Sequence, residues 1–127
     1  MAAAKPVHVV DDDLGVLKGI ARLLSAHGLP VRTFSSAEEF LALADPSEAS
    51  CLILDIHLGG LSGIELMQEL RRSASKTPVV MITANDSEPI RRAAFASGCS
   101  AFLQKRVSAQ ALLGAVRDLA EAPQHLQ

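Results

Sequence analysis

The sequence predicts an α/β fold, an open, doubly wound five-stranded parallel sheet of strand order 2-1-3-4-5, flavodoxin-like, with helices on both faces. Three observations predict it. Short apolar runs alternate five times with longer segments of helical periodicity. Three of the runs are apolar throughout, as strands covered on both faces must be. Five β/α units in 127 residues are too few for a closed eight-stranded barrel.

The expected strands are short and differ in pattern. They cover residues 7–10, 31–34, 51–54, 78–82 and 101–103. Residues 51–54 and 78–82 are continuous apolar runs, which indicates burial on both faces. Residues 31–34 alternate apolar and polar side chains, as expected of an edge strand with one more exposed face.

The expected helices are bounded by capping residues. They cover residues 14–27, 36–44, about 62–70, 86–97 and 108 onward. Gly28 and Gly98 end the first and fourth as C′ glycines. Capping-box pairs open the second and third, and Ser108 caps the last; the pairs are Ser36 with Glu39 and Ser62 with Glu65. Residues 45–48 are expected to form a loop.

Length and composition fit one domain, expected at residues 1–121, with residues 122–127 as a tail or linker stump. A net charge of −2 and the lack of a basic tail argue against a nucleic-acid or membrane surface. No apolar run has transmembrane length, and no signal-peptide core is visible. Cys51 and Cys99 are expected to be reduced thiols. We therefore expect a cytoplasmic protein.

Chemically active side chains stand at the strand ends. They are Asp11, Asp12 and Asp13 after the first strand, Asp55 after the third, Thr83 after the fourth and Lys105 after the fifth. Ligands of open α/β sheets bind outside these carboxyl ends. Because the first and third strands are neighbours, Asp11, Asp12 and Asp55 are expected to crowd together. Crowded carboxylates repel, and Mg²⁺, which prefers oxygen ligands, relieves that repulsion.

Thr83 and Lys105 complete the parts of a phosphoryl-transfer site. An oxygen nucleophile and a metal are joined by a hydroxyl and an ammonium for the phosphoryl oxygens. Taken alone, the three successive aspartates also fit a solvated turn in which Asp13 caps the next helix. The four histidines have no metal-ligand spacing, so a zinc site is not expected.

Four segments resemble the signatures of response-regulator receiver domains. They are Val9-Val-Asp-Asp-Asp13, Leu54-Asp55 with Gly63 eight residues on, Met81-Ile-Thr-Ala84 and Phe102-Leu-Gln-Lys105. They occur in the family's order and span nearly the whole chain. The resemblance implies a chemotaxis-regulator-like fold and a phosphorylation-dependent switch of two-component signalling. The chain is similar to receivers that precede helix-turn-helix transcription-regulating domains.

The resemblance implies a role for each acidic residue. Asp55 is the phosphoacceptor. Asp12 and Asp55 ligate Mg²⁺ directly, and the main-chain carbonyl of His57 is a third ligand. Asp11 acts mainly through water.

The resemblance also implies a switch. Thr83 and Lys105 contact the phosphoryl group, and Phe102 is the aromatic side chain whose rotation reports the state of Thr83. The side chains of His57 and Asn85 tune hydrolysis. The domain is then no enzyme beyond its own phosphorylation and dephosphorylation.

The partners that this family implies are a sensor histidine kinase or phosphotransfer protein as donor, and a homodimer, output domain or effector protein as reader. We expect no DNA binding by these residues. Two departures from the family pattern occur. Arg106 stands where the family usually has proline, so the loop after Lys105 is expected to be set differently. Leu58-Gly59 stands where Met-Pro is frequent, which gives a more permissive backbone.

Two alternatives stay open at this point. Asp11-x-Asp13 formally fits a haloacid-dehalogenase-type phosphatase with Asp11 as nucleophile, although Gly15 stands where that group has Thr or Val. A degenerate receiver that binds partners without phosphate is the other alternative.

Overall fold

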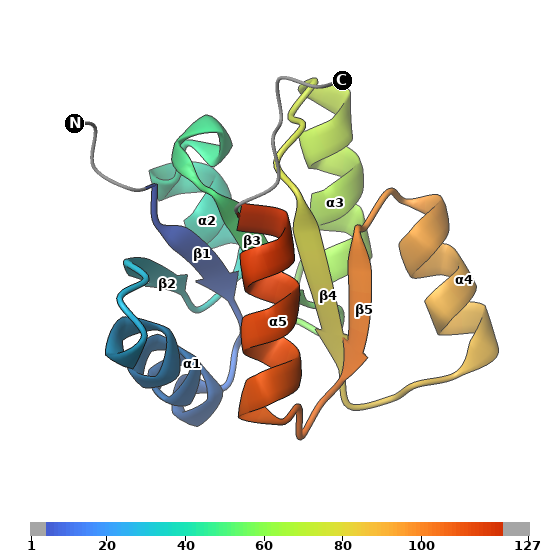
Figure 1. Cartoon of the computed structure of the whole chain (residues 1–127). Coiled ribbons are helices and arrows are strands. Elements are labelled where there is room, and N and C mark those ends of the chain that lie inside the picture. Colours follow the sequence, from blue (N-terminus) through green and yellow to red (C-terminus); the bar gives the residue numbers. More distant parts are fainter. Residues whose placement is uncertain (1–4, 121–127) are drawn as a thin grey trace.

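The structure, a computed structural model, describes residues 5–120 and contains one five-stranded parallel sheet (Figure 1). The strand order is β2-β1-β3-β4-β5, which confirms the predicted fold and order. The strands are β1 (Val7–Val10), β2 (Val31–Phe34), β3 (Cys51–Asp55), β4 (Val79–Thr83) and β5 (Ala101–Gln104).

Five α-helices cover the two faces of the sheet. They are α1 (Leu14–Ala26), α2 (Ala37–Leu43), α3 (Gly63–Arg72), α4 (Glu88–Ala96) and α5 (Ala109–Ala120). Helices α1 and α5 pack on one face, around Leu24 and Val116. Helices α2, α3 and α4 pack on the other, around Phe40, Met67 and Ala94 (Figure 1). Each face therefore has its own apolar core, which explains why the central strands are apolar throughout.

The three expected serine N-caps form as predicted, and Gly28 and Gly98 follow α1 and α4 with positive φ as expected of C′ glycines. Ser62 and Glu65 make a reciprocal capping box, and Ser108 accepts a bond from the Ala111 N–H. Ser36 also caps α2.

The second predicted capping box is incomplete. The Glu39 carboxylate reaches the N–H and hydroxyl of Ser35, at 2.6 and 2.9 Å, and does not return to Ser36. The prediction of a plain loop at residues 45–48 is also wrong. Pro46–Glu48 form a turn of 3₁₀ helix, because Pro46 presets φ and Asp45 caps the turn through Ser47.

Three strand ends lie one residue beyond the apolar runs. Asp55 pairs with Ile82 and Thr83 pairs with Gln104 in the sheet ladder. Asp55 and Thr83 are therefore the last residues of their strands, and the rigid sheet fixes their main chains.

Three further sequence-based expectations concern membrane spans, the two cysteines and the C-terminal tail. Within residues 5–120, no helix is both long enough and apolar enough to cross a membrane. Cys51 and Cys99 are both free and buried, and burial raises the pKa of the Cys51 thiol to about 12. The expected tail at residues 122–127 lies outside the described residues.

His8 is a buried histidine in the middle of β1. Only 1% of its surface is exposed, and its ring packs edge-to-face on Phe34 and Phe40 at centroid distances of 5.4 and 5.8 Å. Neither ring nitrogen has a hydrogen-bond partner among the described residues. Burial, followed by the charge of Arg32, lowers the pKa of His8, although Asp45 opposes this.

We expect His8 to make the fold acid-sensitive. Because its folded-state pKa lies below the unfolded value of about 6.5, protonation favours the unfolded chain. The stability that neutral His8 provides is complete above about pH 6.5 and is lost below it, by up to about 1.4 kcal/mol per pH unit. The His8→Phe variant should therefore have a shallower fall in unfolding free energy between about pH 7 and pH 5, measured by urea titration.

The matched control is His27→Phe, because His27 is exposed at the end of α1. The fall in unfolding free energy of this variant between about pH 7 and pH 5 should equal that of the wild type, because the buried ring of His8 is unchanged. Equal slopes for His8→Phe and the wild type would show that His8 carries none of the acid sensitivity.

Candidate functional site

Three carboxylates meet at the carboxyl-end edge of the sheet. Oxygens of Asp11, Asp12 and Asp55 lie within 4.8 Å of one another. Asp11 and Asp12 follow β1, and Asp55 ends the neighbouring strand β3. Asp11 is fully buried and Asp55 is 2% exposed, while Asp12 faces solvent. The predicted clustering is therefore confirmed in the geometry.

The two buried carboxylates each brace the turn that follows them. Oδ1 of Asp11 accepts a hydrogen bond from the Asp13 N–H at 2.9 Å. Oδ1 of Asp55 accepts one from the His57 N–H at 3.0 Å. Such Asx turns fix the rotamer of the carboxylate, and each leaves its Oδ2 free for other partners.

Lys105 joins the two remaining oxygens. Its Nζ lies 2.9 Å from Asp55 Oδ2 and 3.0 Å from Asp11 Oδ2. Its main-chain N–H donates to the Thr83 carbonyl at 2.6 Å, which anchors the residue to β4. Partial burial works against the ammonium charge, but the hydrogen bonds and charges of Asp55 and Asp11 outweigh it and raise the pKa of Lys105. Lys105 is therefore cationic at neutral pH.

Asp11 is the member of the cluster whose charge is least favoured by its surroundings. Burial is the main cause that raises its pKa, and the Asp55 charge adds to it, against the Asp13 N–H and Lys105. Oδ2 of Asp11 has no well-aligned hydrogen bond within residues 5–120, and the ion pair with Lys105 is its polar contact there. Three carboxylates face one ammonium, so the cluster keeps an excess of negative charge that another cation can neutralise. Hard oxygen ligands with one solvent-facing carboxylate fit Mg²⁺.

Thr83 lies at the same edge, but its hydroxyl is engaged in its own loop. The side chain is fully buried, and Oγ1 accepts a hydrogen bond from the Asn85 N–H at 3.0 Å. The side chains of Asn85 and His57 are both exposed.

Phe102 is half-buried on β5, and its ring contacts side chains of α4. The Arg91 guanidinium stacks on its ring at 4.8 Å, and the Phe95 ring lies 6.2 Å away. Arg91 also pairs with Asp86 at 2.8 Å. Helix α4 is therefore tied to β5 through Arg91.

Asp13 caps α1. Its side chain accepts hydrogen bonds from the N–H groups of Gly15 and Val16. This confirms the expectation that Asp13 is a cap. A phosphatase Asp-x-Asp motif would need Asp13 as its second acid, but here the carboxylate is used by the helix cap.

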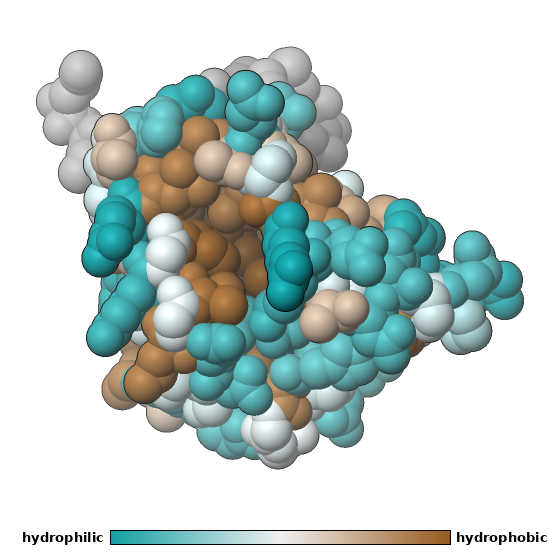
Figure 2. All heavy atoms as spheres, turned by 90° about the horizontal axis from the view of Figure 1, so that it is seen from below, coloured by the Kyte–Doolittle hydropathy of each residue, from teal (hydrophilic) through white to brown (hydrophobic). Residues whose placement is uncertain are grey.

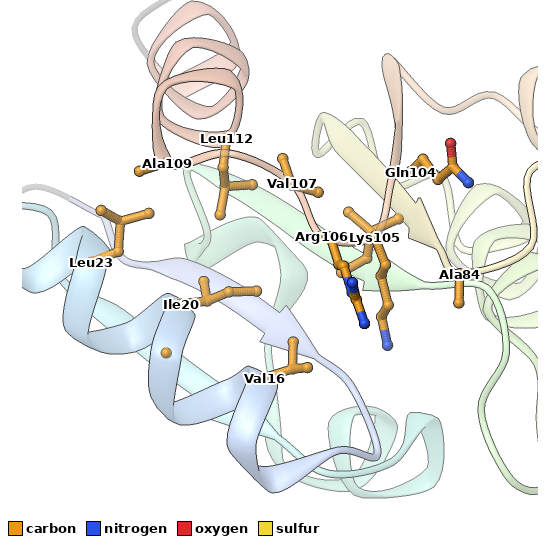
Figure 3. A pocket seen from close by; sticks show the side chains of 12 residues that line it. Val16, Ile20, Leu23, Ala84, Gln104, Lys105, Arg106, Val107, Ala109 and Leu112 are labelled. Carbon is orange, nitrogen blue, oxygen red and sulfur yellow. The ribbon is translucent and has the colours of Figure 1, made fainter.

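Arg106, where the family usually has proline, adopts a left-handed backbone conformation with φ of 65°, and every peptide bond of residues 5–120 is trans. A non-glycine residue pays roughly 1 kcal/mol there. Its side chain runs beside Lys105 toward α1 (Figure 3). That this loop is set differently from the family's stays a prediction.

An apolar groove adjoins the acidic cluster. Figure 2, which views the carboxyl-end edge of the sheet, shows a hollow of apolar side chains on this face. A cavity of about 790 Å³ lies between α1 and the β5–α5 connection, with Lys105 and Arg106 at one end (Figure 3). Its apolar lining includes Val16, Ile20, Leu23, Val107 and Leu112. The groove was not predicted from the sequence, although positions 16, 20 and 23 share helical spacing.

Comparison with known proteins decides the family. The sequence profile of the response regulator receiver domain matches residues 7–117. The chain belongs to the response-regulator receiver domain family. Receiver domains are the phosphorylation-dependent switches of two-component signalling, so the family resemblance drawn from the four strand-end segments is confirmed.

Individual relatives agree with this assignment. The transcriptional regulatory protein FixJ of Azorhizobium caulinodans is 35% identical over 117 residues, covering 92% of this chain and 56% of that protein. Nodulation protein W of Bradyrhizobium diazoefficiens is 38% identical over 110 residues, covering 87% and 48%. The solved structure of response regulator StyR is 39% identical, with a TM-score of 0.86, and covers 94% of this chain and 60% of StyR.

The receiver spans about half the length of these curated relatives. Neither alternative function receives support. The family match covers the chain from β1 into α5, and Asp13 is committed to the helix cap.

Proposed function

We propose that Asp55 is the phosphoacceptor of this receiver. The observation that carries the proposal is the 2.9 Å contact of its Oδ2 with Lys105 Nζ, at a sheet edge shared with Asp11 and Asp12. In the proposed step, a carboxylate oxygen of Asp55 attacks the phosphorus of a phosphohistidine on a sensor kinase or phosphotransfer protein. The P–N bond breaks, and the imidazole leaves with the electron pair and takes up a proton.

Mg²⁺ is the proposed cofactor. Asp12, Asp55 and the His57 carbonyl would hold it directly, and Asp11 through water. When bound, the ion neutralises charge on the phosphoryl group being transferred. The buried Oδ2 of Asp11 supports a cation at this place, because its polar contact within residues 5–120 is itself a cation, the Lys105 ammonium at 3.0 Å.

The proposed switch follows from the added charge. An acyl phosphate brings extra negative charge and three acceptor oxygens, as other phosphorylations do. Lys105 would turn from the carboxylates to a phosphoryl oxygen, and the Thr83 hydroxyl would leave Asn85 to donate to another. Phe102 would then rotate into the space that Thr83 vacates. The equilibrium between two packings of the α4–β5–α5 surface shifts as a result.

The first test is intact mass after incubation with Mg²⁺ and acetyl phosphate. The wild type should gain one phosphoryl group, and the Asp55→Asn variant and a chelator-treated sample should gain none. An unchanged mass of the wild type with Mg²⁺ bound would favour a phosphate-independent receiver.

The exposed side chains of His57 and Asn85 are proposed to tune hydrolysis, because they flank the acceptor and the threonine. His57→Ala and Asn85→Ala should each change the lifetime of the phosphorylated form, followed by mass against time. Unchanged lifetimes in both variants would contradict this role.

We further propose that the phosphohistidine donor docks on the apolar groove. A donor that reaches Asp55 must cover the carboxyl-end edge, and the groove is the apolar surface beside it. The kinase for this test is the one that labels the wild type fastest. Ile20→Asp should slow phosphoryl transfer from that kinase by at least about tenfold. Labelling by acetyl phosphate should stay unchanged.

The control for this docking prediction is Leu43→Asp, the same kind of change on α2, where Leu43 is 61% exposed. It should leave kinase transfer unchanged. Equal rates for Ile20→Asp and the wild type would place the donor elsewhere.

The wider setting is also a proposal. We assign residues 1–121 to the receiver and 122–127 to a tail or linker. Because the transcriptional regulatory protein FixJ and nodulation protein W are each about twice this length, we propose that a homodimer, output domain or effector protein reads the switch in the cytoplasm. The domain's own chemistry is limited to phosphorylation and dephosphorylation of Asp55.

A further inference from the structure

The β3–α3 loop, residues 56–62, carries the main-chain groups that follow Asp55. Its start is held locally, because the His57 N–H donates to Asp55 Oδ1. Its middle is Gly59-Gly60, the most permissive backbone a loop can have, and Gly60 has a φ of 90°. A segment with so many accessible conformations needs a contact from outside to favour one of them.

Glu38, in the first turn of α2, supplies that contact. Its Oε2 accepts a hydrogen bond from the Leu61 N–H at 2.9 Å, across 23 residues of sequence. A Cβ atom on residue 60 would lie 2.9 Å from the same oxygen, so the carboxylate rests against Gly60 where a side chain would otherwise stand. The bond to Leu61 also lowers the pKa of Glu38, which is therefore charged at neutral pH.

We propose that Glu38 is a positioning residue for the magnesium site, which it serves by holding the β3–α3 loop in the conformation that presents the His57 carbonyl. The inference rests on the proposed function, in which that carbonyl and Asp55 bind Mg²⁺. Glu38 touches neither ligand and acts through Leu61 and Gly60. Proline at position 59 would stiffen this loop from within, whereas in this chain the restraint comes from α2.

The loss of the tether should appear as weaker Mg²⁺ binding. Without it, Mg²⁺ must order the loop as it binds. Glu38→Ala should raise the dissociation constant for Mg²⁺ about tenfold, the lower end of what one hydrogen bond to a charged group contributes. Glu38→Asp, too short to reach Leu61, should behave like Glu38→Ala. Glu38→Gln keeps an acceptor oxygen at the same reach and should stay within about twofold of the wild type.

The measurement is an NMR titration with Mg²⁺, because the chain has no Trp or Tyr to report binding by fluorescence. Amide hydrogen exchange in the same samples tests the tether itself. The Leu61 amide should exchange faster in Glu38→Ala and Glu38→Asp than in the wild type.

Glu39→Ala is the matched control. It removes the same charge one residue along, but its carboxylate binds Ser35 and not the loop. It should lower the stability of the fold while leaving Mg²⁺ affinity within about twofold of the wild type. This separates positioning from a general effect of charge or of α2 stability.

The inference is overturned if Glu38→Ala binds Mg²⁺ as the wild type does, or if Glu39→Ala loses as much affinity. Failure of the proposed function has a different signature, which is that the wild type takes up no phosphoryl group from acetyl phosphate at saturating Mg²⁺. Glu38→Ala should reach the wild-type extent of labelling at saturating Mg²⁺, and a lasting defect there would also contradict a role through Mg²⁺ affinity alone.

Discussion

Lys105→Met should destabilise the Mg²⁺-free protein by about 2–3 kcal/mol at neutral pH. In the wild type the ammonium lies 2.9 Å from Asp55 and 3.0 Å from Asp11, whose carboxylates are almost wholly buried. Methionine is likewise unbranched and only one atom shorter, and it removes the ammonium group with its charge and its hydrogen-bond donors. Two buried carboxylates then face each other without a cation, and their repulsion outweighs the packing of the methionine side chain. Urea unfolding in the presence of a chelator measures the difference.

Saturating Mg²⁺ should recover most of that lost stability, because the ion supplies the missing positive charge. The variant should also bind Mg²⁺ about tenfold more tightly, since the ammonium no longer repels the ion or occupies the Oδ2 atoms. Lys18→Met, a change of an exposed lysine on α1, is the control and should alter neither quantity. A Lys105→Met protein as stable as the wild type in chelator would show that the ion pair is screened and structurally unimportant.

The fold was predictable because each level of the sequence points to the same answer. Continuous apolar runs such as residues 51–54 occur where a strand is covered on both faces, and the alternating run at residues 31–34 is the edge strand β2. The ends of the strands were less predictable. Asp55 is polar, so periodicity excludes it from the strand, yet its main chain remains in the ladder opposite Ile82.

The site was predictable to the level of which residues converge. Parallel strands end at one edge, so Asp11, Asp55 and Lys105 had to meet there once the strand order was known. The sequence could not say that Lys105 bridges the two buried carboxylates, because this depends on rotamers. Nor could it say that the Thr83 hydroxyl bonds to Asn85 in this structure.

Long-range contacts between unremarkable residues were beyond prediction. Glu38 is an ordinary first-turn acid of a helix, and nothing near it in sequence indicates that it reaches Leu61. A polar residue such as histidine within a strand is normally expected to face solvent, whereas the His8 ring packs against two phenylalanine rings. Such contacts follow from how helices sit on the sheet, which local patterns leave undetermined.

Among glycine-to-alanine substitutions in the part of the chain that the structure describes, Gly63→Ala should be the most destabilising. It should lower the free energy of unfolding by about 3 kcal/mol. Gly63 is the first residue of α3 and is buried against the end of β3. A Cβ atom there would overlap the main-chain oxygen of Asp55 and lie 2.8 Å from the Ile56 Cα. Both neighbours belong to the main chain and cannot rotate away. Helix α3 must therefore move outward, and the Asp55 turn with it, so Mg²⁺ affinity should also fall in an NMR titration.

Gly114→Ala is the same substitution with the opposite expected sign. Gly114 lies on the exposed side of α5, where a Cβ atom meets nothing within 4 Å. Alanine should stabilise that helix by about 0.5–1 kcal/mol, because it loses less backbone entropy on folding than glycine does. Urea midpoints that shift in opposite directions would establish that close approach, and not helix propensity, determines the residue at position 63. If Gly63→Ala were as stable as the wild type, α3 would have to dock less tightly on β3 than the structure has it.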